Sequence, residues 1–184
     1  MNIIVKPYGS ELCYCRPDTT WEKESRDLYI PEGVDKILWA PVVFARVSKA
    51  GKCVSPKFIT RYYDAVGFGI LAYSDDKDIA YSSCIDHTSI LPLPLFNPVI
   101  FENEENTFNF KIGEKSAAIT ISADIKENLE KAICKASARV SLRIGDLVAL
   151  ELAPPETAIN RTDEEVHLKG EFCENSLFDF KMIF

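Results

Sequence analysis

The stretch Pro41–Gly69, PVVFARVSKAGKCVSPKFITRYYDAVGFG, decides the fold of this chain. It overlaps a run rich in β-branched and aromatic residues, Leu38–Val47, which predicts a strand. A glycine turn follows, and Ser55 with Pro56 directly after it is typical of the start of a helix. Gly67 marks the end of that helix and the opening of a second strand. The stretch therefore predicts strand, turn, helix and strand in succession.

The second half of the chain predicts a mainly β structure. Alternation of apolar and polar residues predicts further strands at Thr107–Ile112, Ala117–Ser122, Leu147–Leu152 and Leu177–Phe184. Gly113 and Glu114 lie between the first two of these and predict a hairpin turn. A helix is expected from Asp124, with Glu127 as its capping-box partner. The proline-rich segment Leu91–Pro98 predicts an irregular loop. We expect an α+β fold of mostly antiparallel strands with a few covering helices, in a single domain over residues 1–184.

Charge and composition exclude several classes of protein. The chain carries 21 basic and 28 acidic residues, a net charge of −7, and no dense basic run. Nucleic acids and anionic membrane surfaces bind clustered Lys and Arg, so neither is an expected partner. No segment approaches the roughly 18 apolar residues of a membrane span, and the apolar N-terminal run is too brief for a signal peptide. We therefore expect a cytoplasmic protein.

The cysteine and histidine residues give weak signals. The six cysteines of a chain of this length without an export signal are expected to be reduced and mostly buried. Cys84, Asp86 and His87 lie close enough in sequence for an acid–base or thiol site, because a histidine can favour a thiolate. The favoured interpretation is a structural Asp86 that is hydrogen-bonded to backbone. His167 lies in a polar stretch and is expected to be exposed.

Four motifs in order along the chain resemble those of one family. The segment RPDTT at Arg16–Thr20 is similar to a K-P-x-T/S motif. Gly51–Gly69 matches a G-K-x-V-S turn, a helix that ends in Y-Y-D, and a G-x-G-I strand. Ile85–Thr88, followed by a proline, resembles F-D-x-S/T, and Arg143–Val148 resembles L-x-x-G-D-L-I. On these motifs the chain resembles the fumarylacetoacetate hydrolase family, in particular its bacterial acylpyruvate hydrolases and hydroxyheptadienedioate isomerases.

The resemblance implies a distorted β-roll, a homodimer, and one Mg²⁺ or Mn²⁺ ion. In the family that ion is held by an E-x-E pair on one strand and an Asp on the next, with a Lys and the Thr of a G-T-P loop nearby. The N-terminal part of this chain is shortened, because the family's usual helical insert is missing. Hard cations need oxygen ligands, and carboxylates supply both charge and geometry.

Carried over residue by residue, the resemblance gives apolar residues where the metal ligands are needed. The two Glu positions fall on Ala40 and Val42, and the Asp position falls on Leu71. The Lys position falls near Ser83, and the G-T-P loop falls on the segment that begins at Glu151. We therefore expect no catalytic residue, no metal ligand and no cofactor, with Mg²⁺ or Mn²⁺ bound only if the family's site is retained after all.

Two hypotheses follow for the function. The first is a degenerate, catalytically inactive protein that acts as a binding or structural module, with a vestigial pocket formed by Ala40, Val42, Leu71, Asp86 and Glu151. Its expected partners are a second copy of the chain and a small organic acid or an apolar ligand. The alternative is an active hydrolase or isomerase of β-diketo or acylpyruvate acids that uses non-standard ligands. Leu150 and Leu152 also replace polar or small groups of the family pattern, and if they still converge with Ala40, Val42 and Leu71, the cavity should be drier and more filled than in an enzyme.

Overall fold

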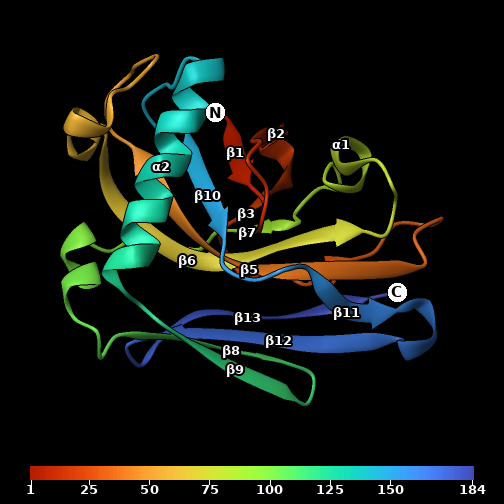
Figure 1. The fold of residues 1–184 in the computed structure, drawn as a ribbon. Helices are drawn as coiled ribbons and strands as arrows, with labels where there is room; N and C mark the ends of the chain where they lie inside the picture. The colour runs from red at the N-terminus through yellow and green to blue at the C-terminus, as the bar shows by residue number, and fades with distance from the viewer.

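The computed structural model describes every residue from Met1 to Phe184, and it consists of two sheets and two α-helices (Figure 1). The larger sheet has eight strands: β1 (Ile3–Lys6), β2 (Tyr14–Arg16), β3 (Trp21–Glu22), β5 (Lys36–Val47), β6 (Tyr63–Ser74), β7 (Ser89–Ile90), β10 (Leu147–Glu151) and β11 (Glu156–Asn160). The smaller sheet has five: β4 (Leu28–Tyr29), β8 (Thr107–Ile112), β9 (Lys115–Thr120), β12 (Glu165–Phe172) and β13 (Asn175–Ile183). The helices are α1 (Ile79–Ser82) and α2 (Ala123–Arg139), with four short 3₁₀ segments at Asp18–Thr20, Pro56–Arg61, Pro98–Glu102 and Arg161–Asp163. The mainly β fold with few helices is as predicted.

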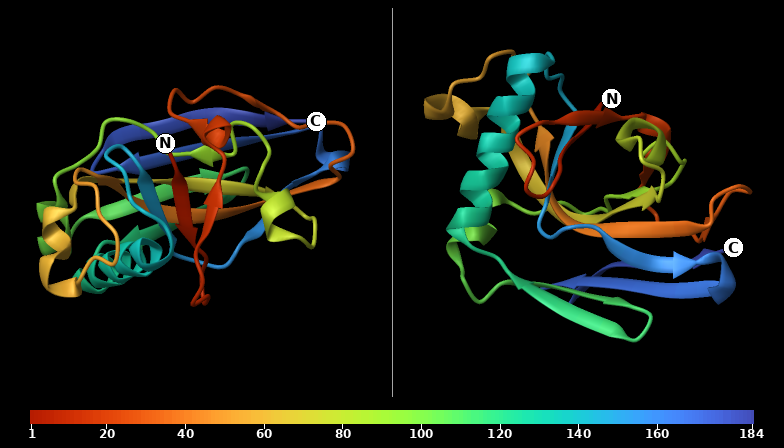
Figure 2. Two further views of the ribbon diagram at one scale, coloured as in Figure 1. Left: turned by 90° about the horizontal axis from the view of Figure 1, so that it is seen from above. Right: turned by 45° about the vertical axis from the view of Figure 1, so that its right-hand side comes forward.

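The larger sheet curls into a roll (Figure 2). Its strand order is β2-β1-β10-β5-β6-β7-β3, with β11 paired to β5 beside the end of β10. Most neighbours are antiparallel, while β1–β10 and β3–β7 are parallel. The convex face of the roll packs against α2 and the smaller sheet in a cluster of 33 buried apolar residues. The concave face encloses a separate cluster of ten. The alternation of side chains along β5 and β6 therefore divides the core in two.

Pro41 lies in the middle of β5, where a proline would normally interrupt the hydrogen-bond ladder. Along one edge, β5 pairs with β10 and then with β11. These two strands leave a gap between them, because β10 pairs only as far as Val42 and β11 pairs only from Trp39 onward. In the gap, the Leu152 N–H donates to the Pro41 carbonyl at 2.8 Å. The missing N–H of Pro41 faces the same side, so no ladder bond is lost.

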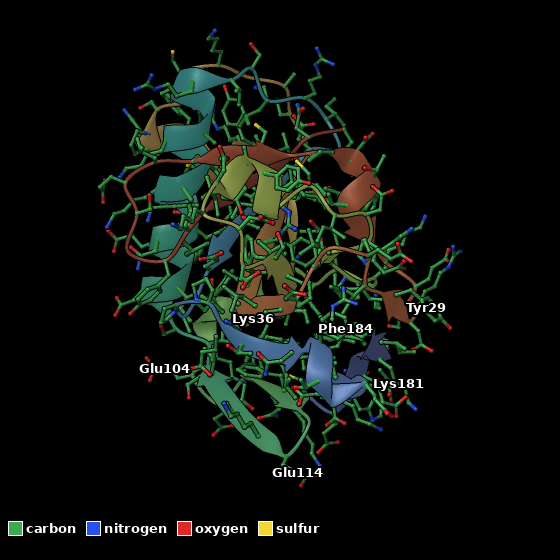
Figure 3. The ribbon with its side chains drawn as sticks, turned by 90° about the vertical axis from the view of Figure 1, so that its right-hand side faces the viewer. Tyr29, Lys36, Glu104, Glu114, Lys181 and Phe184 are labelled. Atoms are coloured by element: carbon green, nitrogen blue, oxygen red, sulfur yellow. The ribbon has the colours of Figure 1, made fainter.

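Three details differ from the sequence prediction. Pro56–Arg61 forms one short 3₁₀ segment instead of a longer helix, and β6 begins at Tyr63 rather than at Gly67. Helix α2 begins at Ala123, because Ser122 caps it by accepting from the Ile125 N–H at 3.4 Å. The hairpin at Gly113 and Glu114 is confirmed, and its tip lies at the periphery of the molecule (Figure 3). Helix α1 and the strands β2, β3, β4, β7, β11 and β12 were not predicted. No helix has the length and apolar character needed to cross a membrane.

Candidate functional site

The roll brings together the three positions to which the resemblance assigns the metal ligands. Ala40 and Leu71 are directly opposite each other on β5 and β6. Val42 lies two residues along β5 from Ala40 and therefore on the same face. All three are fully buried in the ten-residue cluster of the concave face. The expected convergence of these side chains is thus present in the structure, and what surrounds them is hydrocarbon.

One carboxylate lies beside this cluster. Glu151, on β10, is directly opposite Val42 and is only 4% exposed. It accepts a hydrogen bond from the Tyr8 N–H at 2.8 Å and another from the Tyr73 hydroxyl. The Tyr14 hydroxyl in turn donates to the Tyr73 oxygen at 3.0 Å. A chain of three polar groups, Glu151, Tyr73 and Tyr14, therefore borders the apolar cluster.

Arg16 packs against this chain of polar groups from β2. Its guanidinium lies 4.9 Å from the centre of the Tyr73 ring, which allows a cation–π interaction. Its Nε donates to the Ser83 carbonyl at 3.0 Å, and its Nη2 donates to the Ala72 carbonyl and the Thr88 hydroxyl at 2.7 Å each. These bonds tie β2 to β6 and to the α1–β7 segment, although β2 and β6 are not neighbours in the sheet.

The Arg16 charge lacks a direct counter-ion. The residue is 2% exposed and takes part in none of the ion pairs of the structure. Its Nη1 is the one buried side-chain nitrogen or oxygen without a hydrogen-bond partner. Buried charges are normally paired, and an unpartnered buried donor is unfavourable. Arg16 therefore has an Nη1 group without a hydrogen-bond partner and no direct ion-pair partner inside the protein.

Burial dominates the electrostatics of this region. It raises the pKa of the Glu151 carboxyl, against the opposing effects of the Tyr73 and Tyr8 hydrogen bonds and the Arg16 charge. It raises the pKa of Tyr14 to about 12 and that of Tyr73 well above the usual value. Burial also lowers the pKa of Arg16. Each of these shifts disfavours the charged form of the group, as desolvation does.

The raised pKa of Glu151 gives a pH-dependent stability. The folded state binds this proton more tightly than the unfolded state, so the contribution of Glu151 is largest below its ordinary pKa of 4.5 and is lost as pH rises through the folded value. We expect Glu151→Gln to remove this pH dependence of the free energy of unfolding, because a neutral amide does not titrate and can still bond both Tyr8 and Tyr73. Urea unfolding of both proteins between about pH 5 and about pH 8 should show the variant gaining stability relative to the native chain as pH rises. A constant difference would contradict a buried, ionisable Glu151.

Other residues proposed from sequence lie elsewhere. Asp86 is exposed and outside the cluster, and it takes part in no hydrogen bond, so its expected structural role is wrong. Leu150 faces the convex side and belongs to the other cluster, and Leu152 packs at that cluster's edge, so neither joins the apolar cluster of the concave face. Ser83 is buried and contributes its carbonyl to Arg16. His167 is exposed, as expected, and lies 2.5 Å from Asp179.

The thiols and the second histidine also differ from expectation. All six cysteines are free, but none is buried and four are exposed. The Cys84 thiol donates to the Ala80 carbonyl at 2.7 Å. His87 instead bonds the buried Glu22 through Nδ1 at 3.1 Å. These two residues are 65 positions apart, and no motif links them.

The residues that the resemblance assigns to the metal position do not fit a divalent cation. Alanine, valine and leucine side chains carry no donor atom, and hard cations need six or more oxygen ligands. The single neighbouring carboxylate, Glu151, already accepts two hydrogen bonds. No group of three or more His, Cys, Asp or Glu side chains capable of holding a metal occurs in the structure. The donor set therefore differs fundamentally from that of a metal-dependent hydrolase.

Comparisons with solved structures identify the fold. A protein from Yersinia pestis, described as of the fumarylacetoacetate hydrolase family, matches with a TM-score of 0.77 and 11% identity, over 99% of this chain and 91% of that one. Fumarylpyruvate hydrolase from Pseudomonas aeruginosa, solved with Mn²⁺ and pyruvate, matches at 0.76 and 11%, over 100% and 90%. A 5-carboxymethyl-2-hydroxymuconate delta-isomerase from Mycobacterium smegmatis matches at 0.75 and 8%, over 99% and 78%.

No protein-family profile matches the sequence, and no curated protein sequence does either. The structural matches nevertheless extend over nearly the whole chain. The chain therefore has the fold of the fumarylacetoacetate hydrolase family, which confirms the resemblance seen in its motifs. Within that fold, its interior combines an apolar cluster with a buried arginine, two tyrosines and one glutamate.

Proposed function

We propose that this chain is a degenerate member of the fumarylacetoacetate hydrolase family that binds a small organic acid without a metal and without catalysis. The observation that supports the absence of catalysis is the burial of Ala40, Val42 and Leu71 in one apolar cluster. The chemistry of the family depends on a divalent ion that polarises the substrate oxygens. Without ligands for that ion, the interior lacks the Lewis acid on which this chemistry depends.

Arg16 supports the choice of ligand. A guanidinium with one free donor and no ion-pair partner is suited to a carboxylate, which it can bind through charge-assisted hydrogen bonds. The Tyr73 ring and the apolar cluster lie beside the charged group and are chemically compatible with a short carbon chain. The favoured ligand is therefore a small monocarboxylic acid. An active enzyme with non-standard ligands is less well supported, because Glu151 alone supplies a carboxylate here.

Thermal unfolding with two ligands tests both parts of this proposal. Mn²⁺ at about 1 mM should leave the Tm of the native chain unchanged, because only ligands that bind the folded state raise it. Pyruvate at about a hundredfold excess over its Kd should stabilise the chain by about 2.7 kcal/mol, a rise of about 5–10 °C. Pyruvamide, which has the same shape without the charge, should have no effect.

The matched variant is Arg16→Lys, which keeps the positive charge but loses the planar fork of donors. It should abolish the response to pyruvate. A Tm rise of several degrees with Mn²⁺ would overturn the proposal that the interior binds no metal. An equal rise of the Tm with pyruvate in Arg16→Lys, or no rise in the native chain, would overturn the carboxylate site. Neither result bears on metal binding, which the Mn²⁺ measurement tests by itself.

A further inference from the structure

Arg16 and Glu151 both contact the Tyr73 side chain. The Arg16 guanidinium lies 4.9 Å from the centre of the Tyr73 ring, and the Tyr73 hydroxyl donates a hydrogen bond to the Glu151 carboxylate. Arg16 and Glu151 do not form an ion pair with each other. Burial raises the pKa of Glu151, and the Arg16 charge acts against that rise by favouring the ionised carboxylate. The charge of Arg16 and the protonation of Glu151 are therefore coupled.

The other ionisable groups around Glu151 cannot take up a proton near neutral pH. Besides Arg16 they are a lysine and three tyrosines: Lys6, Tyr8, Tyr14 and Tyr73. A lysine ammonium, an arginine guanidinium and a tyrosine hydroxyl already carry their protons in that range. Helix α2 and strand β5 face Glu151 with uncharged side chains, Ile125, Asn128 and Val42. A proton that enters this cluster is therefore bound by Glu151 itself.

We propose that a carboxylate bound to Arg16 is accompanied by uptake of a proton at Glu151, so that Glu151 determines the affinity of the site without touching the ligand. This inference rests on the ligand proposed above. The bound negative charge offsets that of Arg16 and so removes the attraction that favours an ionised Glu151. Glu151 lines a hollow between the β1–β2 loop and α2, and there it takes the proton from solvent. No bond of the ligand forms or breaks.

The coupling makes the affinity depend on pH. Protonation of Glu151 favours ligand binding by the same factor by which the ligand favours protonation. When Glu151 is neutral in both the free and the bound protein, the affinity is highest, and when it is ionised in both, the affinity is lowest. Between these limits the Kd falls as pH falls, by at most about tenfold per pH unit. Pyruvate itself stays ionised over this range and contributes nothing to the change.

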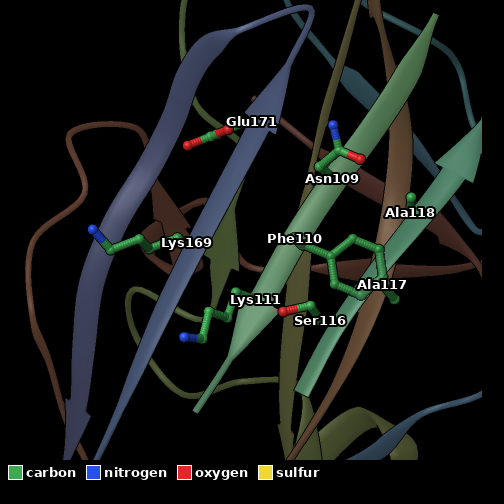
Figure 4. Close-up of a pocket in the computed structure, with 8 residues that line it drawn as sticks. All are labelled: Asn109, Phe110, Lys111, Ser116, Ala117, Ala118, Lys169 and Glu171. Atoms are coloured by element: carbon green, nitrogen blue, oxygen red, sulfur yellow. The ribbon is translucent and has the colours of Figure 1, made fainter. Parts of the chain in front are cut away.

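Two other places can bind a proton or a carboxylate, and each provides a control. His87 directly precedes Thr88, whose hydroxyl accepts from Arg16, and imidazole side chains titrate near neutral pH. On the outer face of the smaller sheet, Lys111 lies directly opposite Lys169 beside an open hollow (Figure 4). A carboxylate bound to these lysines would not be coupled to Glu151. Proton uptake therefore distinguishes the interior site from the surface.

Isothermal titration calorimetry with pyruvate tests the coupling. Between about pH 5 and about pH 8, each titration is repeated in two buffers of different ionisation enthalpy, because the difference in heat counts the protons taken up. The Kd of the native chain should be about tenfold lower at the acid end, with about half a proton taken up per pyruvate at the maximum in between. Glu151→Gln should take up no proton and should bind at every pH with about the affinity that the native chain has at the acid end.

The control variants His87→Gln and Lys111→Ala should both keep the proton uptake of the native chain. Binding of pyruvate without a buffer-dependent heat would overturn the coupling and leave the carboxylate site in place. Uptake that persists in Glu151→Gln, or that disappears in His87→Gln, would assign the proton to another group and overturn it too. Loss of binding in Lys111→Ala, or no binding to the native chain, would overturn both the coupling and the proposed function.

Tyr73→Phe is the second variant if Glu151→Gln fails to fold. It keeps the ring beside Arg16 but removes the hydroxyl that favours the ionised Glu151. The carboxyl should then bind its proton more tightly, so the maximum of proton uptake should move to higher pH. A structural role of Glu151 alone would not move that maximum, and an unchanged maximum would contradict the proposal.

Discussion

Leu71→Asp is expected to lower the free energy of unfolding by about 4 kcal/mol or more. The substitution removes a fully buried leucine from the apolar cluster and places a carboxyl group among hydrocarbon side chains. A carboxylate without a partner in such surroundings loses its hydration without compensation. Urea unfolding of the purified variant measures the change.

Leu71→Asn is the matched control, because asparagine has the same shape as aspartate without the charge. The aspartate variant should be the less stable of the two at neutral pH, and the difference should shrink as pH falls. The reason is that an apolar environment raises the pKa of a carboxyl, so acid restores its neutral form. A loss of less than about 1 kcal/mol for Leu71→Asp would show that water reaches this position, contrary to a dry interior.

Restoring all three carboxylates should make the fold depend on metal. The variant that combines Ala40→Glu, Val42→Glu and Leu71→Asp brings three acidic groups into one cluster, where their mutual repulsion opposes folding. A divalent ion relieves that repulsion and supplies the missing charge. We expect Mn²⁺ at a hundredfold excess over its Kd to raise the Tm of this variant by about 5–10 °C, while the native chain does not respond.

The control for this variant carries Gln, Gln and Asn at the same positions and should not respond to Mn²⁺. Near-ultraviolet circular dichroism reports whether metal restores packing in a variant that is unfolded without it. A triple variant that is folded and unresponsive, or that stays unfolded with Mn²⁺, would mean that these three positions do not correspond to the family's ligands.

Local pattern was sufficient to predict much of the fold. The strand at Leu38–Val47 is rich in β-branched and aromatic residues and is buried on both faces, whereas the hairpin strand Thr107–Ile112 and the C-terminal strand alternate apolar and polar residues. Strand β12 was missed because one of its inward positions is Gly170, which has low strand propensity. A glycine is required there, since a Cβ would lie 2.2 Å from the Phe178 ring. That requirement depends on a cross-strand neighbour and is invisible in the local sequence.

The site was only partly predictable for a similar reason. Alternation along two adjacent strands places Ala40, Val42 and Leu71 on one face, and the structure confirms that they meet. The same rule puts Tyr73 on that face, two residues beyond Leu71. Glu151, which accepts a hydrogen bond from the Tyr73 hydroxyl, lies on a strand that is distant in the sequence. The role of Arg16 depends on the curl of the sheet, which brings β2 across to β6. Nothing in the local sequence predicts that curl.

Diffraction at the manganese absorption edge, from crystals grown with Mn²⁺, tests the central claim most directly. It locates bound manganese by its anomalous signal, independently of any effect on stability. The account predicts no anomalous peak inside the roll near Ala40, Val42 and Leu71. A strong peak there, coordinated by oxygen atoms of the protein, would contradict it.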